Sequence, residues 1–254
     1  MVSPIKLLIQ ELQRALFSRR FLLCTLGYTI LLCISVDRNS DAGAIYQFQF
    51  IYATGFYMLF LICATMPFAD SYLRDYCTKS YTTIIQQTTI TAYLRTKVIV
   101  TVLSGALCIM ISSILLICYL VFRFPLNTLS STDYDGYGVL LNDGQYLLYF
   151  VIRISLTCVI GSVYATFALM CSPILKNTNA VTFSPLFSFY IFNELINFGY
   201  IPEVFNLTKI LYTPYSFFDG MISNYLFSLA VLVGLITLFG SCFVKTARRQ
   251  ISND

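Results

Sequence analysis

Long apolar runs alternate with short polar segments along the entire chain. A helix needs about 20 apolar residues to cross a bilayer, at a rise of about 1.5 Å per residue. Six windows approach or exceed that length: 21–36, 48–69, 98–122, 147–171, 181–199 and 224–244. Arg19 and Arg20 can lengthen the short first window by reaching toward the headgroups. The pattern predicts an all-α membrane protein, a single transmembrane domain over 1–254 with six transmembrane helices.

The basic residues are distributed unevenly between the two sides of such an arrangement. With a cytoplasmic N-terminus, twelve of the sixteen Lys and Arg residues fall in internal segments, and only Arg38, Arg123 and Lys209 fall in outer loops. An excess of Lys and Arg on one side marks the cytoplasmic side. We expect both termini in the cytoplasm and a multi-pass protein of the plasma membrane, the inner membrane of a bacterium.

The N-terminal residues 3–19 have the pattern of an amphipathic interfacial helix. Ser3 suits an N-cap and Pro4 suits the first turn. One stripe of the helix is apolar: Ile5, Leu8, Ile9, Leu12 and Leu16. Two roles stay open, a membrane anchor or an element that transmits motion to the first span. A cleaved signal peptide over 21–36, with Ala42-Gly43-Ala44 as its cleavage site, is a further alternative.

Composition excludes several classes of function. The chain has 254 residues, 57% hydrophobic and 11% charged, with no His and no Trp. Without His, zinc proteases that use histidine ligands and Ser-His-Asp hydrolases lose a required residue. The nine Cys form no C-x-x-C, so we expect neither a metal site nor a disulfide framework. No G-x-x-x-x-G-K-[ST] occurs, so the chain does not cradle nucleotide phosphates itself.

Three connecting segments have distinct compositions. Residues 70–97 are polar and free of Gly and Pro, which favours two short helices that dock on a cytoplasmic surface. Residues 123–146 contain Asp and Gly, which indicates turns. Residues 200–223 are apolar with Pro202 and Pro214, which predicts a re-entrant segment at the outer side.

This order of parts resembles the membrane (permease) subunit of a type 2 ABC transporter of the exporter class, over nearly the full length. Asp70 and Asp75-Tyr76 are similar to the opening of the family's first internal loop, and Tyr93-Leu94-Arg95-Thr96-Lys97 is similar to its end. The central Gly-Thr of the family is missing, and Lys79-Ser80-Tyr81 stands near its place.

The resemblance implies that 70–97 is a cytoplasmic coupling loop that moves with a separate ATPase. The residues expected to bind that partner are Asp75, Tyr81, Ile84, Ile85, Tyr93 and Arg95. ATP and Mg would be bound by the ATP-binding subunit, and this chain would carry no cofactor and no catalytic residue. A second permease copy, in a homo- or heterodimer, would enclose the pathway within membrane lipid, with no nucleic acid. The alternative is an amphipathic loop helix that rests on the membrane.

Ionisable and amide side chains also fall inside the predicted spans. Arg153 and Glu194 lie at similar depths in the fourth and fifth windows, with opposite charge. A lone charge in a span costs about 2.5–3.5 kcal/mol on insertion scales, so we expect these two to pair. Asn193 and Asn197 lie beside Glu194. The group is either a clamp between two spans or a polar patch in the transport pathway.

The sequence thus favours a permease of an ATP-driven exporter, with no enzymatic activity of its own. Its cargo would be a drug, a lipid or a peptide such as a bacteriocin. The alternative is a self-contained secondary transporter or channel, which predicts broken helices, repeats and midplane charges.

Overall fold

The structure is a computed structural model that describes residues 3–37, 43–53, 57–126, 137–202, 206, 207, 210 and 220–253. These residues form helices and turns, without a strand. The helices are α1 Pro4–Leu16, α2 Arg19–Ile34, α3 Ala44–Ala53, α4 Tyr57–Thr65, α5 Ser71–Cys77, α6 Ser80–Gln87, α7 Ile90–Arg123, α8 Val139–Asn142, α9 Tyr146–Cys171, α10 Thr178–Asn197 and α12 Met221–Asn253.

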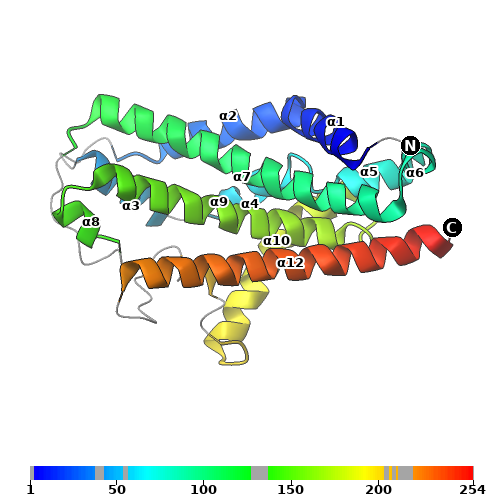
Figure 1. Cartoon of the computed structure of the whole chain (residues 1–254). Helices are drawn as coiled ribbons and strands as arrows, with labels where there is room; N and C mark the ends of the chain where they lie inside the picture. Colours follow the sequence, from blue (N-terminus) through cyan, green and yellow to red (C-terminus); the bar gives the residue numbers. More distant parts are fainter. Residues whose placement is uncertain are drawn as a thin grey trace.

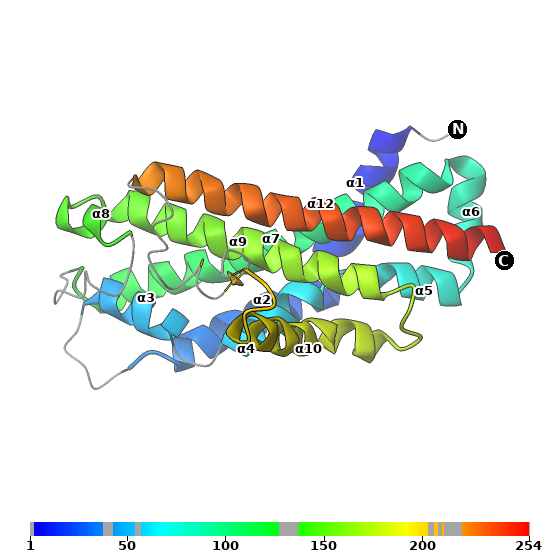
Figure 2. The same ribbon diagram turned by 90° about the horizontal axis from the view of Figure 1, so that it is seen from below.

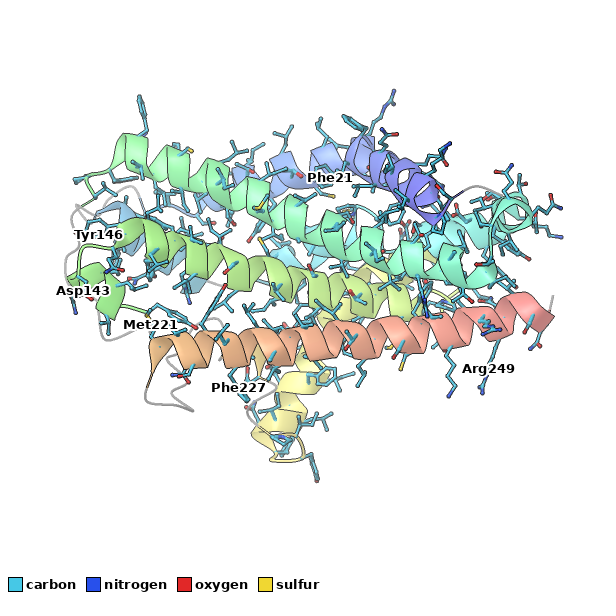
Figure 3. The ribbon with its side chains drawn as sticks, viewed as in Figure 1. Phe21, Asp143, Tyr146, Met221, Phe227 and Arg249 are labelled. Carbon is cyan, nitrogen blue, oxygen red and sulfur yellow. The ribbon has the colours of Figure 1, made fainter. Side chains whose placement is uncertain are left out.

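The three longest helices, α7, α9 and α12, run along one bundle axis, and both ends of the chain lie at the same end of it (Figure 1). The short helices α5 and α6 lie at this end, which we call the terminal end. The α8 helix and the start of α9 lie at the opposite end, as the labels of Asp143 and Tyr146 show (Figure 3).

Within the described part of the chain, three helices are long and apolar enough to cross a membrane: α7, α9 and α12. The pair α1 and α2 passes the same test together, with a bend of 50° between them. The protein is therefore a helical bundle with the character of a membrane protein. The six predicted spans are only partly matched, and six stays a prediction.

The other three predicted windows contain shorter or more polar helices. The α2 helix has 16 residues, and the described part of window 48–69 contains the end of α3 and the whole of α4, with 54–56 outside the described residues. The α10 helix has 20 residues, but it contains Pro185 and several Ser, Thr and Asn side chains that reduce its hydropathy. Residues 127–136 and most of 200–223 lie outside the described residues, as does Ala42. The predicted re-entrant segment and cleavage site are therefore not tested.

The α9 helix forms the centre of the bundle. Its most apolar stretch is 67% buried, against 39% for α7 and 17% for α12. It packs against α7, α12, α4 and α10 (Figure 2). The α12 helix is therefore the least buried of these three and lies at the outside of the bundle.

The N-terminal helix α1 begins as the sequence predicts but packs differently. Ser3 accepts a hydrogen bond from the backbone N–H of Lys6, and Pro4 occupies the first turn. Ile5 and Ile9 of the predicted apolar stripe are exposed, whereas Leu8 and Leu12 pack against Ala15, Phe68 and Val100. The α1 helix is thus docked against α7 along a face that is rotated from the predicted stripe.

Polar side chains join the helices inside the bundle. The Tyr52 and Ser113 hydroxyls are hydrogen-bonded at 2.8 Å, and Ser112 donates to the carbonyl of Thr25 at 3.0 Å. Ser162 donates to the carbonyl of Val102 at 3.0 Å. Interhelical hydrogen bonds of this kind supply part of the association energy when lipid removes the hydrophobic driving force.

Gly105 of α7 lies at a close approach between helices. A Cβ atom at this position would lie 3.0 Å from the Ala165 Cβ of α9 and 3.1 Å from the backbone oxygen of Ala64 in α4. Three helices therefore meet where α7 lacks a side chain.

We predict that Gly105→Val destabilises the bundle by about 1–3 kcal/mol, because the added atoms force helices apart. The measurement is the thermal unfolding midpoint of the purified protein in detergent. Gly234→Val is the matched control, because a Cβ at Gly234 of α12 meets no atom within 4 Å. Equal effects of the two substitutions would contradict this explanation.

Candidate functional site

The most distinctive polar feature is a lysine buried completely at the terminal end. Lys97 of α7 has no exposed side-chain surface. Its Nζ lies 2.7 Å from a carboxylate oxygen of Glu11 in α1 and 2.6 Å from one of Asp75 in α5. The same Nζ lies 4.9 Å from the centre of the Phe68 ring and 5.4 Å from that of Tyr93. One ammonium group therefore joins three helices that are far apart in sequence.

Two further side chains complete this cluster, which we call the Lys97 network. Arg14 donates to Asp75 at 2.9 Å and lies 3.5 Å from Glu11. The Tyr93 hydroxyl donates to the other Asp75 oxygen at 3.1 Å. The network contains two cations and two carboxylates, so its formal charge is balanced. Balance and dense hydrogen bonding are what a buried ionic group needs to offset its desolvation.

The surrounding charges change the proton affinity of Asp75. Burial alone would raise the pKa of Asp75, but the Lys97 and Arg14 charges and hydrogen bonds outweigh burial and hold it below its ordinary value. Asp75 is therefore ionised at physiological pH, and it accepts the proton of the Tyr93 hydroxyl as a hydrogen bond.

A second ionic cluster ties α2 to the same region. Asp70, at the start of α5, lies 2.7 Å from Arg20 of α2 and 3.0 Å from Arg74 one turn on. The Asp70 side chain is buried, whereas both arginines are partly exposed. Exposure screens these pairs, so each is worth less than the two pairs that the buried Lys97 makes. With both clusters, α5 is held to α1, α2 and α7.

The helices α5 and α6 form a compact hairpin, in agreement with the two short helices predicted over 70–97. Lys79 joins them with a φ of 56°, in the left-handed region where glycine costs least. The conformation costs a residue with a Cβ about 1–2 kcal/mol.

Aromatic side chains connect the hairpin to α12. The Tyr81 ring stacks on Tyr76 at 5.7 Å, and Tyr76 stacks on Tyr72 at 6.1 Å. Tyr72 meets Phe243 of α12 edge-on at 5.2 Å, and its hydroxyl donates to Gln250 at 3.0 Å. The hairpin is therefore packed against the last third of α12 as well.

The structure separates the six residues predicted to bind a partner. Asp75, Tyr93 and Tyr81 are buried inside the chain, so in this conformation they hold the hairpin instead of contacting another protein. Ile84 and Ile85 are half-buried against the same aromatic cluster, and Arg95 is exposed on α7. The exposed surface of α6 is polar, and its exposed residues are Thr82, Thr83, Gln86 and Gln87.

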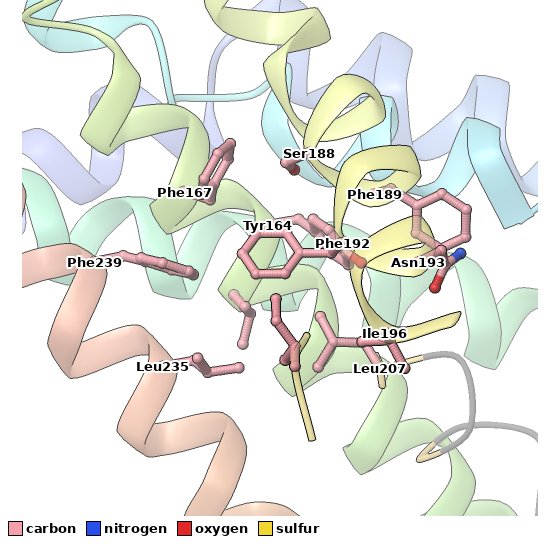
Figure 4. A pocket seen from close by; sticks show the side chains of 12 residues that line it. Tyr164, Phe167, Ser188, Phe189, Phe192, Asn193, Ile196, Leu207, Leu235 and Phe239 are labelled. Atoms are coloured by element: carbon pink, nitrogen blue, oxygen red, sulfur yellow. The ribbon is translucent and has the colours of Figure 1, made fainter. Parts of the chain in front are cut away.

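A cavity of about 200 Å³ lies between α9, α10 and α12 (Figure 4). Its wall is aromatic and aliphatic, with two polar side chains, Ser188 and Asn193. The lining also includes Tyr164, Phe167, Phe189, Phe192, Leu235 and Phe239. A cavity with this lining accepts an apolar group and offers it a few hydrogen-bonding positions.

The polar group predicted inside the spans is dispersed in the structure. Arg153 of α9 is buried, whereas Glu194 and Asn197 of α10 are exposed, and Asn193 lines the cavity. Among the described residues, no ion pair closer than 4.0 Å joins Arg153 to Glu194. Their predicted pairing therefore gains no support here and stays a prediction, and the same holds for a role in a pathway.

Glu11 and Lys97 are the functional candidates that the sequence analysis did not select. Glu11 is the only acidic residue before Asp37, and it lies on the same face of α1 as Leu7 and Ala15, which are buried. An isolated acid on an apolar face is the signal that predicts a buried cation as its partner. Lys97 directly precedes an apolar window. At that position its charge fits the ordinary excess of Lys and Arg at the cytoplasmic ends of spans.

We predict that removing two opposite charges from the network destabilises the protein less than the sum of the two single removals. Lys97→Met or Asp75→Asn alone leaves an unbalanced buried charge and should cost about 3–5 kcal/mol. The double variant should cost less than the sum, with a coupling of about 0.5–3 kcal/mol. Unfolding midpoints of the four proteins in detergent measure this coupling, and strict additivity would contradict the network.

The depressed pKa of Asp75 also predicts an acid-sensitive stability. A carboxyl whose pKa is lower in the folded state adds stability above its unfolded pKa, about 3.9, and loses that contribution as pH falls through the folded value. The difference in unfolding midpoint between the natural protein and Asp75→Asn should therefore shrink below about pH 4. A difference that stays constant between neutral and strongly acidic pH would show that the charge of Asp75 contributes nothing.

No family model, no curated protein and no solved structure matches the chain. Its function is therefore inferred from its own residues and their arrangement.

Proposed function

We propose that the chain is the permease subunit of an ATP-driven ABC exporter of the type 2 class. In this proposal two permease copies form the transport pathway, and a separate ATP-binding subunit docks at the terminal end, which faces the cytoplasm. The chain carries no ATP-binding motif and would hydrolyse nothing itself. The cargo would be a drug, a lipid or a peptide such as a bacteriocin.

The observation that carries this proposal is the way the α5–α6 hairpin is fixed to the rest of the bundle. The Lys97 network joins it to α1 and α7, Asp70 joins it to α2, and the tyrosine stack joins it to α12. A ligand or partner shifts a conformational equilibrium only through contacts that differ between the two states. A hairpin attached to four helices is able to convert such contacts into movement of the whole bundle.

The exposed side of α6 supports the idea that something docks there. Its residues Thr82, Thr83, Gln86 and Gln87 are all exposed, and its opposite side is sealed by Tyr81, Ile84 and Ile85. A helix that merely rested on a membrane would present apolar side chains outward. The polar outward face therefore favours a protein partner over the lipid alternative.

The predicted topology fits the same proposal. In it α7, α9 and α12 are three of the six spans, and α2, the pair α3 and α4, and α10 are the others. Because six is an even number of membrane crossings, both termini lie on the same side of the membrane. That side would be the cytoplasm, because most Lys and Arg residues fall in the segments assigned to it.

The cavity between α9, α10 and α12 is the best candidate for contact with cargo. It combines aromatic walls with Ser188 and Asn193, and α12 at its edge is the least buried of the long helices. A second copy that packed against α12 would extend the cavity into a shared pathway. Its apolar lining favours an amphipathic or lipophilic cargo.

We predict that the protein, expressed with its genomic neighbours and purified in mild detergent, co-elutes with an ATPase that carries a Walker motif. Gln86→Glu with Gln87→Glu should reduce this co-elution severalfold, because it places two negative charges on the docking face. Gln10→Glu with Gln13→Glu is the matched control, since these exposed glutamines lie on α1. Co-eluting proteins are identified and quantified by mass spectrometry.

A pure, stable preparation without an ATPase would contradict the proposal and favour the self-contained transporter. Equal losses in the two double variants would show that α6 is not the docking face. Retention of the ATPase in all variants would place its binding surface elsewhere on the chain.

A further inference from the structure

A groove of about 940 Å³ runs between the start of α7 and the second half of α12. None of its lining residues belongs to the Lys97 network or lines the cavity. Its apolar residues are Val98, Ile99, Ile236 and Val244, and Gly240 forms part of its wall where α12 approaches Val98. The groove therefore extends along α7 and α12, from their apolar parts to their polar ends.

Four cationic side chains surround the polar end of this groove. Arg95 belongs to α7, and Lys245, Arg248 and Arg249 belong to α12. All four are exposed, and Arg249 projects away from the bundle near the end of α12 (Figure 3). Among the described residues, none of the four forms an ion pair within 4.0 Å, and no acidic residue lines the groove.

The spacing on α12 gathers the charges at one place. Lys245, Arg248 and Arg249 are three and four residues apart, so they share one helical face with Ser241 and Ser252. Like charges so close repel one another, and an anion between them would remove that repulsion. The hydroxyls in the groove wall belong to Thr237, Ser241 and Ser252, and each donates to a backbone carbonyl of α12. Their hydrogen bonds are therefore satisfied within the helix.

We infer that this groove binds an anionic phospholipid of the cytoplasmic leaflet. Its phosphate would lie among Arg95, Lys245, Arg248 and Arg249, and its acyl chain would lie along Val98, Ile99 and Ile236. The charges select an anion, and the apolar floor selects one that carries a hydrocarbon chain. The inference depends on the proposed membrane orientation, but it does not depend on an ATPase partner.

Clustered Lys and Arg residues beside a membrane helix usually attract anionic lipid without a defined site. A defined groove predicts more than this. Binding should require both the negative charge of the headgroup and the acyl chain of the lipid. A free phosphate compound should bind poorly, and a zwitterionic lipid should not compete.

The test is native mass spectrometry on protein delipidated in detergent and then exposed to phosphatidylglycerol, phosphatidylcholine or glycerol phosphate. We expect at least about tenfold higher occupancy by phosphatidylglycerol than by the other two, since each basic residue near the surface contributes favourably. The variant Arg95→Gln/Lys245→Gln/Arg248→Gln/Arg249→Gln should bind phosphatidylglycerol no better than phosphatidylcholine.

The matched control is Lys6→Gln/Arg19→Gln/Lys79→Gln/Lys176→Gln, which removes the same charge from exposed positions outside the groove. It should retain the preference for phosphatidylglycerol. A second variant, Ser241→Phe, keeps every charge and fills the groove, so it should lower occupancy severalfold.

Three results would overturn the inference. Equal loss in the control variant would show diffuse attraction instead of a site. Unchanged binding in Ser241→Phe would show that the chain does not occupy the groove, and equal binding of glycerol phosphate would show a site for a small anion. Loss of the ATPase partner with retained lipid binding would contradict only the proposed function.

Discussion

The buried ammonium group of Lys97 is the constraint on which the terminal end of the molecule depends. A lysine without water is tolerated only when carboxylates surround it, and here they come from α1 and α5. Each of these helices is short and would be marginal alone. Their positions are therefore fixed by one charge on α7, with Arg14 and Tyr93 completing the hydrogen bonds of Asp75.

This arrangement changes the meaning of the N-terminal helix. An amphipathic helix that lies on a membrane surface is free to slide and rotate, because lipid makes no specific contacts with it. The α1 helix instead presents Glu11 to the interior and exposes Ile5 and Ile9. The Lys97 network joins α1 to the hairpin α5–α6, so we expect the two elements to move as one rigid unit.

Local patterns in the sequence predicted much of the fold and less of the site. Apolar windows located α7, α9 and α12 well, and Ser3, Pro4 and the absence of Gly in 70–97 indicated α1 and the short helices. Window 48–69 covers the end of α3 and all of α4, but hydropathy does not show that α3 begins earlier, at Ala44. The network was missed because Glu11 and Lys97 are joined by tertiary packing. For the same reason the burial of Asp75, Tyr81 and Tyr93 could not be deduced from their spacing.

The long separation of Glu11 and Lys97 also bears on how the chain is made. The two residues are 86 positions apart. At a synthesis rate of about 5–20 residues per second, Glu11 exists for roughly 4 to 17 seconds before Lys97 is added. During that interval α1 lacks the cation that determines its place. The N-terminal helix therefore reaches its final, charge-paired position only after the start of α7 has been made.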